Sequence, residues 1–119
     1  MSSFPSPAED LGAKRIELFA QLITHPAATF FVKARVYGMA EAGISDDDTL
    51  IVNRAIKPKH GNIVMAVVDG EPIIRRLYKR SGRIKLQAAS VTYPDIQFKE
   101  GQQLEVWGVV TYAIKDLRV

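Results

Sequence analysis

The chain has 119 residues, of which 47% are hydrophobic, and a formal net charge of +3 from 16 basic and 13 acidic side chains. This composition is typical of one ordinary globular domain: it is too short for two independent cores and too hydrophobic for a disordered protein. The absence of cysteine excludes disulfides and thiolate metal sites and is consistent with a reducing compartment. No apolar run is long enough to cross a bilayer. We therefore expect a cytoplasmic protein without a membrane partner.

The first part of the chain predicts a short extended segment followed by a helix. Residues 1–7 are rich in Ser and Pro and predict a flexible segment ahead of a single domain over residues 8–119. Ser6-Pro7-Ala8-Glu9 has the form of a capping box, with its proline at the first helical position. Pro26 predicts that the helix ends near Thr24. Apolar residues recur at helical spacing at Leu11, Leu18, Phe19, Leu22 and Ile23. We expect this stripe to cover the core rather than to face a membrane or a partner.

From Thr29 onward the hydrophobic period changes to two, which predicts strands. Over 29–36 the inward face is predicted to carry Phe30, Val32, Ala34 and Val36. Residues 38–43 predict a short helical turn that ends at Gly43. Further strands are predicted at Thr49–Asn53, Asn62–Val68, Pro72–Tyr78, Arg83–Ala88 and Leu104–Ala113, with hairpin turns at Asp69-Gly70 and Ser81-Gly82. The predicted fold class is mainly β, a β-rich α+β domain: a curled, mostly antiparallel sheet with one N-terminal amphipathic helix.

Few residues qualify as metal ligands or catalytic groups, and we assign no metal and no cofactor. Asp46, Asp47 and Asp48 lack the alternating spacing and closing Glu of a calcium loop, so a polar turn is the preferred interpretation. His25 precedes a proline and His60 precedes a glycine, which is typical of solvated turn residues. Ser45 and Ser90 are possible nucleophiles, but nothing in their spacing places a Lys or His beside either of them.

Basic residues cluster within eleven positions of the predicted hairpin, at Arg75, Arg76, Lys79, Arg80, Arg83 and Lys85. Such a patch is able to bind phosphate or an acidic protein. The preferred interpretation is a solvated hairpin, because charged side chains discourage stray strand pairing and no aromatic series interleaves with them to stack bases. Whether Arg75–Lys85 contacts DNA stays open.

Three segments, 34–39, 43–52 and 67–71, resemble the self-cleaving LexA/UmuD family, the S24 peptidase-like group. Within that family the chain is most similar to the UmuD′ branch, the processed form, and one residue is inserted around 78–83. The supporting segments occur in the same order at Phe4–Ala8, His25–Thr29, Phe31–Ala34, His60-Gly61, Asp69–Glu71 and Gly108–Val110.

The resemblance implies that Gly38 and Arg75 stand where the family has its catalytic Ser and Lys. Glycine has no side chain and so supplies no nucleophile, and arginine stays protonated, so Arg75 cannot act as a general base. We therefore expect a pseudo-peptidase without the Ser/Lys dyad, in which Gly38 and Arg75 are the degenerate dyad positions and no residue is catalytic.

The resemblance also bears on how the dyad was lost. In the family a flexible arm is removed just before the Phe-Pro-Ser-Pro segment, whereas this sequence opens with Met1-Ser2-Ser3 and then that segment, so we expect no bond to cut. Val36 and Tyr37 also depart from the small pair that the family carries before its Ser. Natural decay is therefore preferred over an engineered knockout, and Tyr37 is predicted to fill the former substrate groove.

The implied function is that of a non-catalytic accessory subunit of an error-prone Y-family DNA polymerase, acting as a homodimer in SOS translesion synthesis and mutagenesis after DNA damage. Its implied partners are a UmuC-like catalytic subunit and the RecA filament, in a bacterial, phage-encoded or plasmid-encoded context. Dimer contacts carried over from the family fall on Met65, Pro72 and Trp107, and Trp107 could equally be a core residue. Two alternatives remain: a regulatory decoy that forms mixed dimers with a host UmuD, and a residual Ser/Lys-type peptidase.

Overall fold

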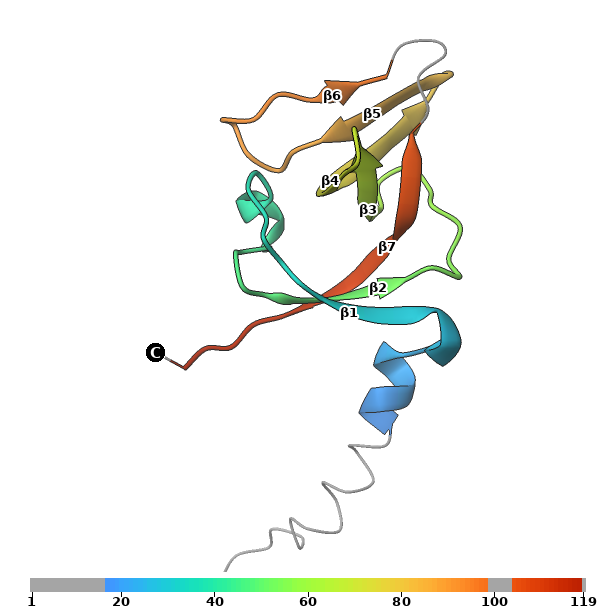
Figure 1. The fold of residues 1–119 in the computed structure, drawn as a ribbon, viewed down its shortest axis with the longest axis vertical. Helices are drawn as coiled ribbons and strands as arrows, with labels where there is room; N and C mark the ends of the chain where they lie inside the picture. Colours follow the sequence, from blue (N-terminus) through green and yellow to red (C-terminus); the bar gives the residue numbers. More distant parts are fainter. Residues whose placement is uncertain (1–16, 99–103, 119) are drawn as a thin grey trace, which may run out of the picture.

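One seven-stranded antiparallel sheet forms the body of the protein (Figure 1). The structure is a computed structural model and describes residues 17–98 and 104–118. The sheet order is β1-β2-β7-β3-β4-β5-β6. The strands are β1 (Thr29–Lys33), β2 (Thr49–Asn53), β3 (Ile63–Val68), β4 (Glu71–Arg80), β5 (Arg83–Gln87), β6 (Ile96–Gln97) and β7 (Glu105–Ile114). Two 3₁₀ turns, η1 (Pro26–Ala28) and η2 (Ala40–Ala42), precede β1 and β2. The predicted mainly β, mostly antiparallel fold is confirmed.

Strand β7 joins the two halves of the sheet and gives it its curl. Its first half pairs with β3 and its second half with β2, so Figure 1 shows it running from the β3–β6 part to the β1–β2 part. Both ladders shift register: Trp107 is skipped between the partners of Met65 and Ala66, and Thr111 between those of Ile51 and Val52. Extra residues of this kind bend a strand and increase its twist. The two bulges therefore explain how a single sheet folds over its own core.

The core consists of two clusters of buried side chains. The first lies between β1, β2, η2 and the start of β4 and contains Ala34, Val36, Met39, Ile44, Leu50, Val52 and Ile74. The second lies under β3, β4, β5 and β7 and contains Val64, Ala66, Leu77, Leu86 and Val109. Gly108 allows the sheet to close at this point, because a Cβ there would lie 2.6 Å from Cγ1 of Val52. The predicted inward positions Ala34 and Val36 are buried, whereas Phe30 is exposed.

Both predicted hairpin turns are confirmed. In each turn both central residues have positive φ angles: Asp69 and Gly70 at 51° and 80°, and Ser81 and Gly82 at 54° and 73°. This is the type I′ geometry that matches the twist of antiparallel strands. The predicted strands agree with β1–β5 and β7 to within a few residues, and β2 agrees at both ends. The short strand β6 was not predicted, because two residues carry no periodic pattern.

The N-terminal helix differs from its prediction in what it covers. Its described part spans residues 17–22, so the expected end near Thr24 is confirmed, while the expected start and the segment 1–7 lie outside the described residues. Leu18 and Phe19 are 53% and 59% exposed, so the stripe does not cover the core there. The segment is attached to the sheet through its end, where the Asn53 amide lies 3.0 Å from Nδ1 of His25. In the part of the chain that the structure describes, no helix is both long and apolar enough to span a bilayer.

Candidate functional site

Gly38 lies in the tight loop between β1 and η2, with φ +88°. This left-handed conformation favours glycine because a Cβ there clashes with the backbone. The Gly38 carbonyl accepts a hydrogen bond from the Ala89 amide at 2.7 Å, and the Glu41 amide donates to the Ala89 carbonyl at 2.9 Å. These two bonds hold the loop against the segment that follows β5.

Arg75 projects from β4 to the same loop and is only 8% exposed. Its Nη1 donates to the carbonyl oxygens of Tyr37 and Ile74 at 2.8 and 2.7 Å, and Nε has no hydrogen-bond partner in the described structure. Burial lowers the pKa of Arg75 from its ordinary value, with a smaller opposing effect of Tyr93. Arginine nevertheless remains a cation, so this side chain donates hydrogen bonds but does not accept a proton.

The structure thus brings Gly38 and Arg75 side by side, and Tyr93 closes the space between them. A Cβ built on Gly38 would lie 3.2 Å from Nη2 of Arg75 and 3.2 Å from two ring carbons of Tyr93. The Tyr93 ring also faces the Arg75 guanidinium, at 5.8 Å from its centre. Tyr37 is 69% exposed, so the prediction that it fills the groove is wrong. An aromatic ring does cover the site, but it comes from the loop after β5.

A hollow of about 200 Å³ runs along the chain before Gly38. One wall is the segment Val32–Val36, and the other is formed by Met65, Pro72 and Ile74. The lining is mainly apolar, and Lys33 and Arg35 are the charged residues in it. The lining includes Val36 but not Gly38, so the hollow ends close to the loop that Arg75 contacts. Its apolar lining suits apolar side chains.

The three candidate dimer contacts lie on neighbouring strands and differ in burial. Met65 is half-buried against the first core cluster and lies opposite Ile74, and Pro72 is exposed at the start of β4. Trp107, at the β7 bulge, packs against that cluster and on Phe30 with ring centres 5.0 Å apart. The guanidinium of Arg54 also lies over the Trp107 ring, 4.5 Å from its centre. Met65 and Pro72 share the hollow described above, while Trp107 is half-buried and lies outside its lining.

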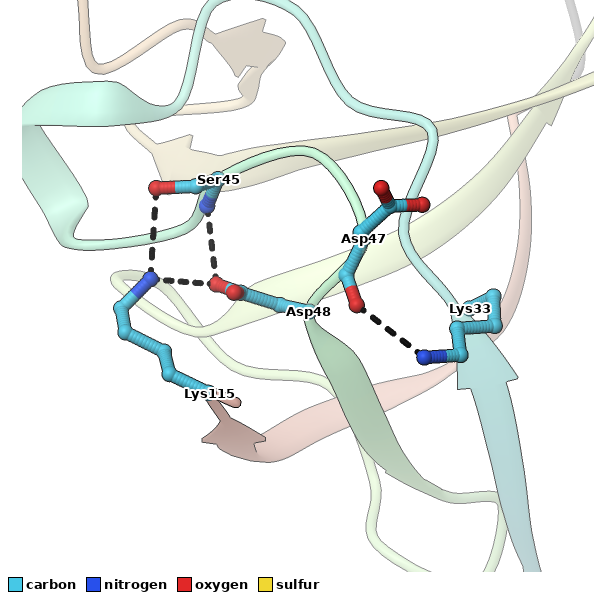
Figure 2. A network of polar contacts seen from close by, with 5 residues as sticks. All are labelled: Lys33, Ser45, Asp47, Asp48 and Lys115. Carbon is cyan, nitrogen blue, oxygen red and sulfur yellow. Dashed lines mark hydrogen bonds and ion pairs between the residues drawn. The ribbon is translucent and has the colours of Figure 1, made fainter. Parts of the chain in front are cut away.

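Ser45 has a lysine beside it, contrary to the inference from spacing. Lys115 Nζ lies 3.3 Å from Ser45 Oγ and 2.5 Å from Oδ2 of Asp48, and the Ser45 amide donates to that carboxylate at 2.9 Å (Figure 2). Burial alone raises the pKa of Asp48, but the bonds from Lys115 and Ser45 outweigh it and hold the pKa below its ordinary value. An ammonium held in this ion pair has no lone pair with which to accept the Ser45 proton. The arrangement is therefore structural.

The three consecutive carboxylates diverge. The Asp48 side chain is buried and faces Lys115, whereas Asp46 and Asp47 are exposed, and the Asp47 carbonyl accepts from Lys33 at 3.3 Å (Figure 2). Among the described residues no group of three or more His, Asp or Glu is placed to hold a metal ion.

The two histidines have structural contacts. His25 Nδ1 lies 3.0 Å from the Asn53 amide, and His60 Nδ1 accepts from the Lys79 backbone amide at 3.0 Å. Ser90 Oγ accepts from the Thr92 amide at 3.2 Å. None of these contacts joins a histidine to a serine.

The basic cluster divides into buried and exposed members. Arg75 is buried, and Arg76 is half-buried and donates to the Gly61 carbonyl at 2.8 Å, so the expectation that the whole cluster lies on a solvated face is wrong for these two. Lys79, Arg80 and Arg83 are exposed around the confirmed turn. Lys85 is half-buried, with its ammonium 5.0 Å from the centre of the Tyr78 ring.

Sequence reasoning found Gly38 and Arg75 but missed Tyr93 and Lys115. Each of these two lies far along the chain from the residue that it contacts, and no local pattern marks either contact. The Tyr93-Pro94 pair indicates a turn after β5, but it does not show where the ring points.

Comparison with known proteins identifies a family and several relatives over nearly the whole chain. The model of the family described as Peptidase S24-like matches residues 2–111. Protein ImpA of Escherichia coli is 39% identical over 117 residues, which are 98% of this chain and 79% of ImpA. Protein SamA of Salmonella typhimurium is 40% identical, covering 98% of this chain and 81% of SamA. Protein MucA of Escherichia coli is 32% identical over 114 residues, 95% of this chain and 77% of MucA.

Proposed function

The chain belongs to the Peptidase S24-like family, and from this premise we propose that it is a non-catalytic, UmuD′-like accessory subunit of an error-prone Y-family DNA polymerase. It would act as a homodimer in SOS translesion synthesis, together with a UmuC-like catalytic subunit and the RecA filament. The similarity to ImpA, SamA and MucA, which are UmuD-like proteins, over nearly the whole chain supports this proposal.

The proposal that the chain is non-catalytic rests on the neighbouring positions of Gly38 and Arg75. The loop position that would present a nucleophile has no side chain, and the neighbouring β4 position carries a permanent cation that is bonded to the loop carbonyl of Tyr37 at 2.8 Å. Acyl transfer needs a nucleophile and a group that accepts its proton, and neither is present at this pair. Ser45 with Lys115 does not replace them, because the Lys115 amine is engaged in an ion pair with Asp48.

The region beside Gly38 is proposed to bind other chains. The hollow beside Val32–Val36 presents an apolar lining next to Pro72, which is exposed. Apolar surface that is open to solvent is a usual component of protein interfaces. We therefore place the dimer contact at Met65 and Pro72, with Trp107 stabilising the neighbouring part of β7.

Analytical ultracentrifugation of the chain, alone and mixed with the purified cognate polymerase, tests this proposal. A dimer that forms a stable complex with the polymerase is expected. A chain that stays monomeric and forms no complex with the polymerase would contradict the proposal. A chain that instead pairs only with a full-length UmuD would support the regulatory decoy.

The residual peptidase is tested separately by incubation with a full-length, arm-bearing UmuD. No cleavage product is expected, even at alkaline pH where a lysine would be deprotonated. A shortened UmuD in the parent reaction would show that a nucleophile and a base are present after all.

A further inference from the structure

A second hollow, of about 300 Å³, is lined by residues of β4, β5, the start of β7 and the loop after β2. Its floor is apolar and is formed by Leu77, Ile84, Phe98 and Val106. Its rim carries the ammonium-bearing side chains of Lys57 and Lys79. The feature is therefore a short apolar groove flanked by positive charge.

The cations around this groove are numerous and accessible. Lys57 and Lys79 are exposed, and Lys59, Arg80 and Arg83 are exposed close to them in sequence. The loop of Lys57 and Lys59 is fixed against β4, because the Lys79 amide donates to His60 and the Gly61 amide donates to the Leu77 carbonyl at 2.8 Å. In the part of the chain that the structure describes, the ion pairs are Asp48–Lys115 and Asp116–Arg118, and neither engages these cations.

We propose that this groove binds an acidic segment of a partner protein, with an apolar side chain of that segment in the groove and its carboxylates on Lys57 and Lys79. The positive charge of Lys57 and Lys79 on the rim indicates an anionic partner. The apolar floor indicates that this partner is a peptide with an apolar side chain. Three of the four floor side chains are aliphatic, which suits an apolar side chain of a peptide, whereas a nucleic acid would have the single ring of Phe98 to stack on. This inference does not depend on the identity of the polymerase partner proposed above.

The electrostatic part of the site is expected to add specificity and association rate more than affinity. The rim charges are exposed, so each pair contributes little and is screened by salt. The groove accommodates one or two apolar side chains, and the fit of these side chains decides which acidic segments bind. Binding is therefore expected to need both features in one ligand.

The probe is a fluorescein-labelled peptide of twelve residues in which glutamate alternates with leucine, titrated with the full chain and followed by fluorescence anisotropy at low and high salt. Two matched peptides replace glutamate with lysine or leucine with serine. A labelled single-stranded oligonucleotide of twelve nucleotides tests the nucleic-acid alternative. Methyl NMR of the bound chain locates the probe, with shifts expected at Leu77 and Ile84.

Three variants separate the two features of the site. Lys57→Glu with Lys79→Glu should weaken binding of the acidic peptide about tenfold, because two favourable contacts become repulsive. Ile84→Gln should weaken it several-fold without a change in folding, since Ile84 is 37% exposed. Arg118→Glu, an exposed charge reversal near the C-terminus and outside the lining of both hollows, is the matched control and should leave binding unchanged.

The proposal is supported if binding is saturable and requires both glutamate and leucine in the probe. The groove variants, and not the control variant, should weaken this binding. The proposal is overturned if no binding occurs, or if Arg118→Glu weakens binding as much as the lysine reversals, which would indicate an effect of net charge only. Tighter binding of the oligonucleotide, lost in the same lysine variants, would assign the surface to nucleic acid instead.

Discussion

Restoring the two family residues should not restore a peptidase. The change is Gly38→Ser combined with Arg75→Lys, which supplies a hydroxyl and an amine in place of the glycine and the guanidinium. Gly38 has a φ of +88°, and a Cβ at this position meets the Tyr93 ring at 3.2 Å. The introduced serine would therefore be strained and pressed against the Tyr93 ring.

The expected loss in the free energy of unfolding follows from the contacts that change. A side chain in the left-handed region costs about 1–2 kcal/mol. Arg75→Lys removes the two Nη1 hydrogen bonds to the carbonyls of Tyr37 and Ile74, each with a net value of about 0.5–1.5 kcal/mol. The two changes are coupled, because Nη2 of Arg75 is one of the atoms that the new Cβ meets at 3.2 Å. The double variant should lose about 2–4 kcal/mol in the free energy of unfolding.

Urea unfolding measures the loss, and Gly43→Ser is the matched control. Gly43 also has a left-handed φ, +81°, but nothing lies within 4 Å of its Cβ position, so this variant reports backbone strain alone. Gly38→Ser should cost more than Gly43→Ser, and incubation of the double variant with a full-length UmuD should yield no cleaved product. A double variant that is as stable as the parent and cuts that substrate would refute the reasoning about the loop and Tyr93.

Three further outcomes are expected. Gly108→Ala should lower the free energy of unfolding by about 1–3 kcal/mol, measured in urea, because the new methyl group would overpack against buried Val52. Asp48→Asn should cost about 1–3 kcal/mol at neutral pH. Because the folded pKa of Asp48 is lowered, its contribution is complete above the unfolded pKa and is lost as pH falls through the folded one. Urea midpoints from pH 7 to pH 2 should therefore converge for parent and variant, and a constant difference would contradict the ion pair with Lys115. Pro72→Glu should weaken self-association in sedimentation while the chain stays folded, since Pro72 is exposed, and an unchanged dimer would exclude this face.

Local signals in the sequence predicted the strands and turns well. Asp69-Gly70 and Ser81-Gly82 supplied the positive φ angles that hairpins require, and the polar turn before Thr49 marked the start of β2 correctly. These features depend on residues adjacent in the chain. The same local reasoning missed the bulge at Trp107, because a register shift depends on which residues of β3 lie opposite.

The candidate site was predicted only in part, for the same physical reason. Gly38 and Arg75 were placed together by the family resemblance, and in the structure a Cβ built on Gly38 would lie 3.2 Å from Nη2 of Arg75. Tyr93 over Gly38 and Lys115 beside Ser45 are tertiary contacts between distant segments, which periodicity does not encode. The prediction that the apolar stripe of the helix covers the core was wrong at Leu18, which is exposed. Amphipathic spacing predicts an apolar face but not what that face packs against.

The accessory role is tested by primer extension across a DNA lesion. The purified cognate Y-family polymerase is assayed with a RecA filament, with or without this chain. We expect the chain to stimulate bypass while its own mass and that of the polymerase stay unchanged. Bypass that is the same with and without the chain would contradict the accessory role, and proteolytic shortening of either protein would contradict the non-catalytic one.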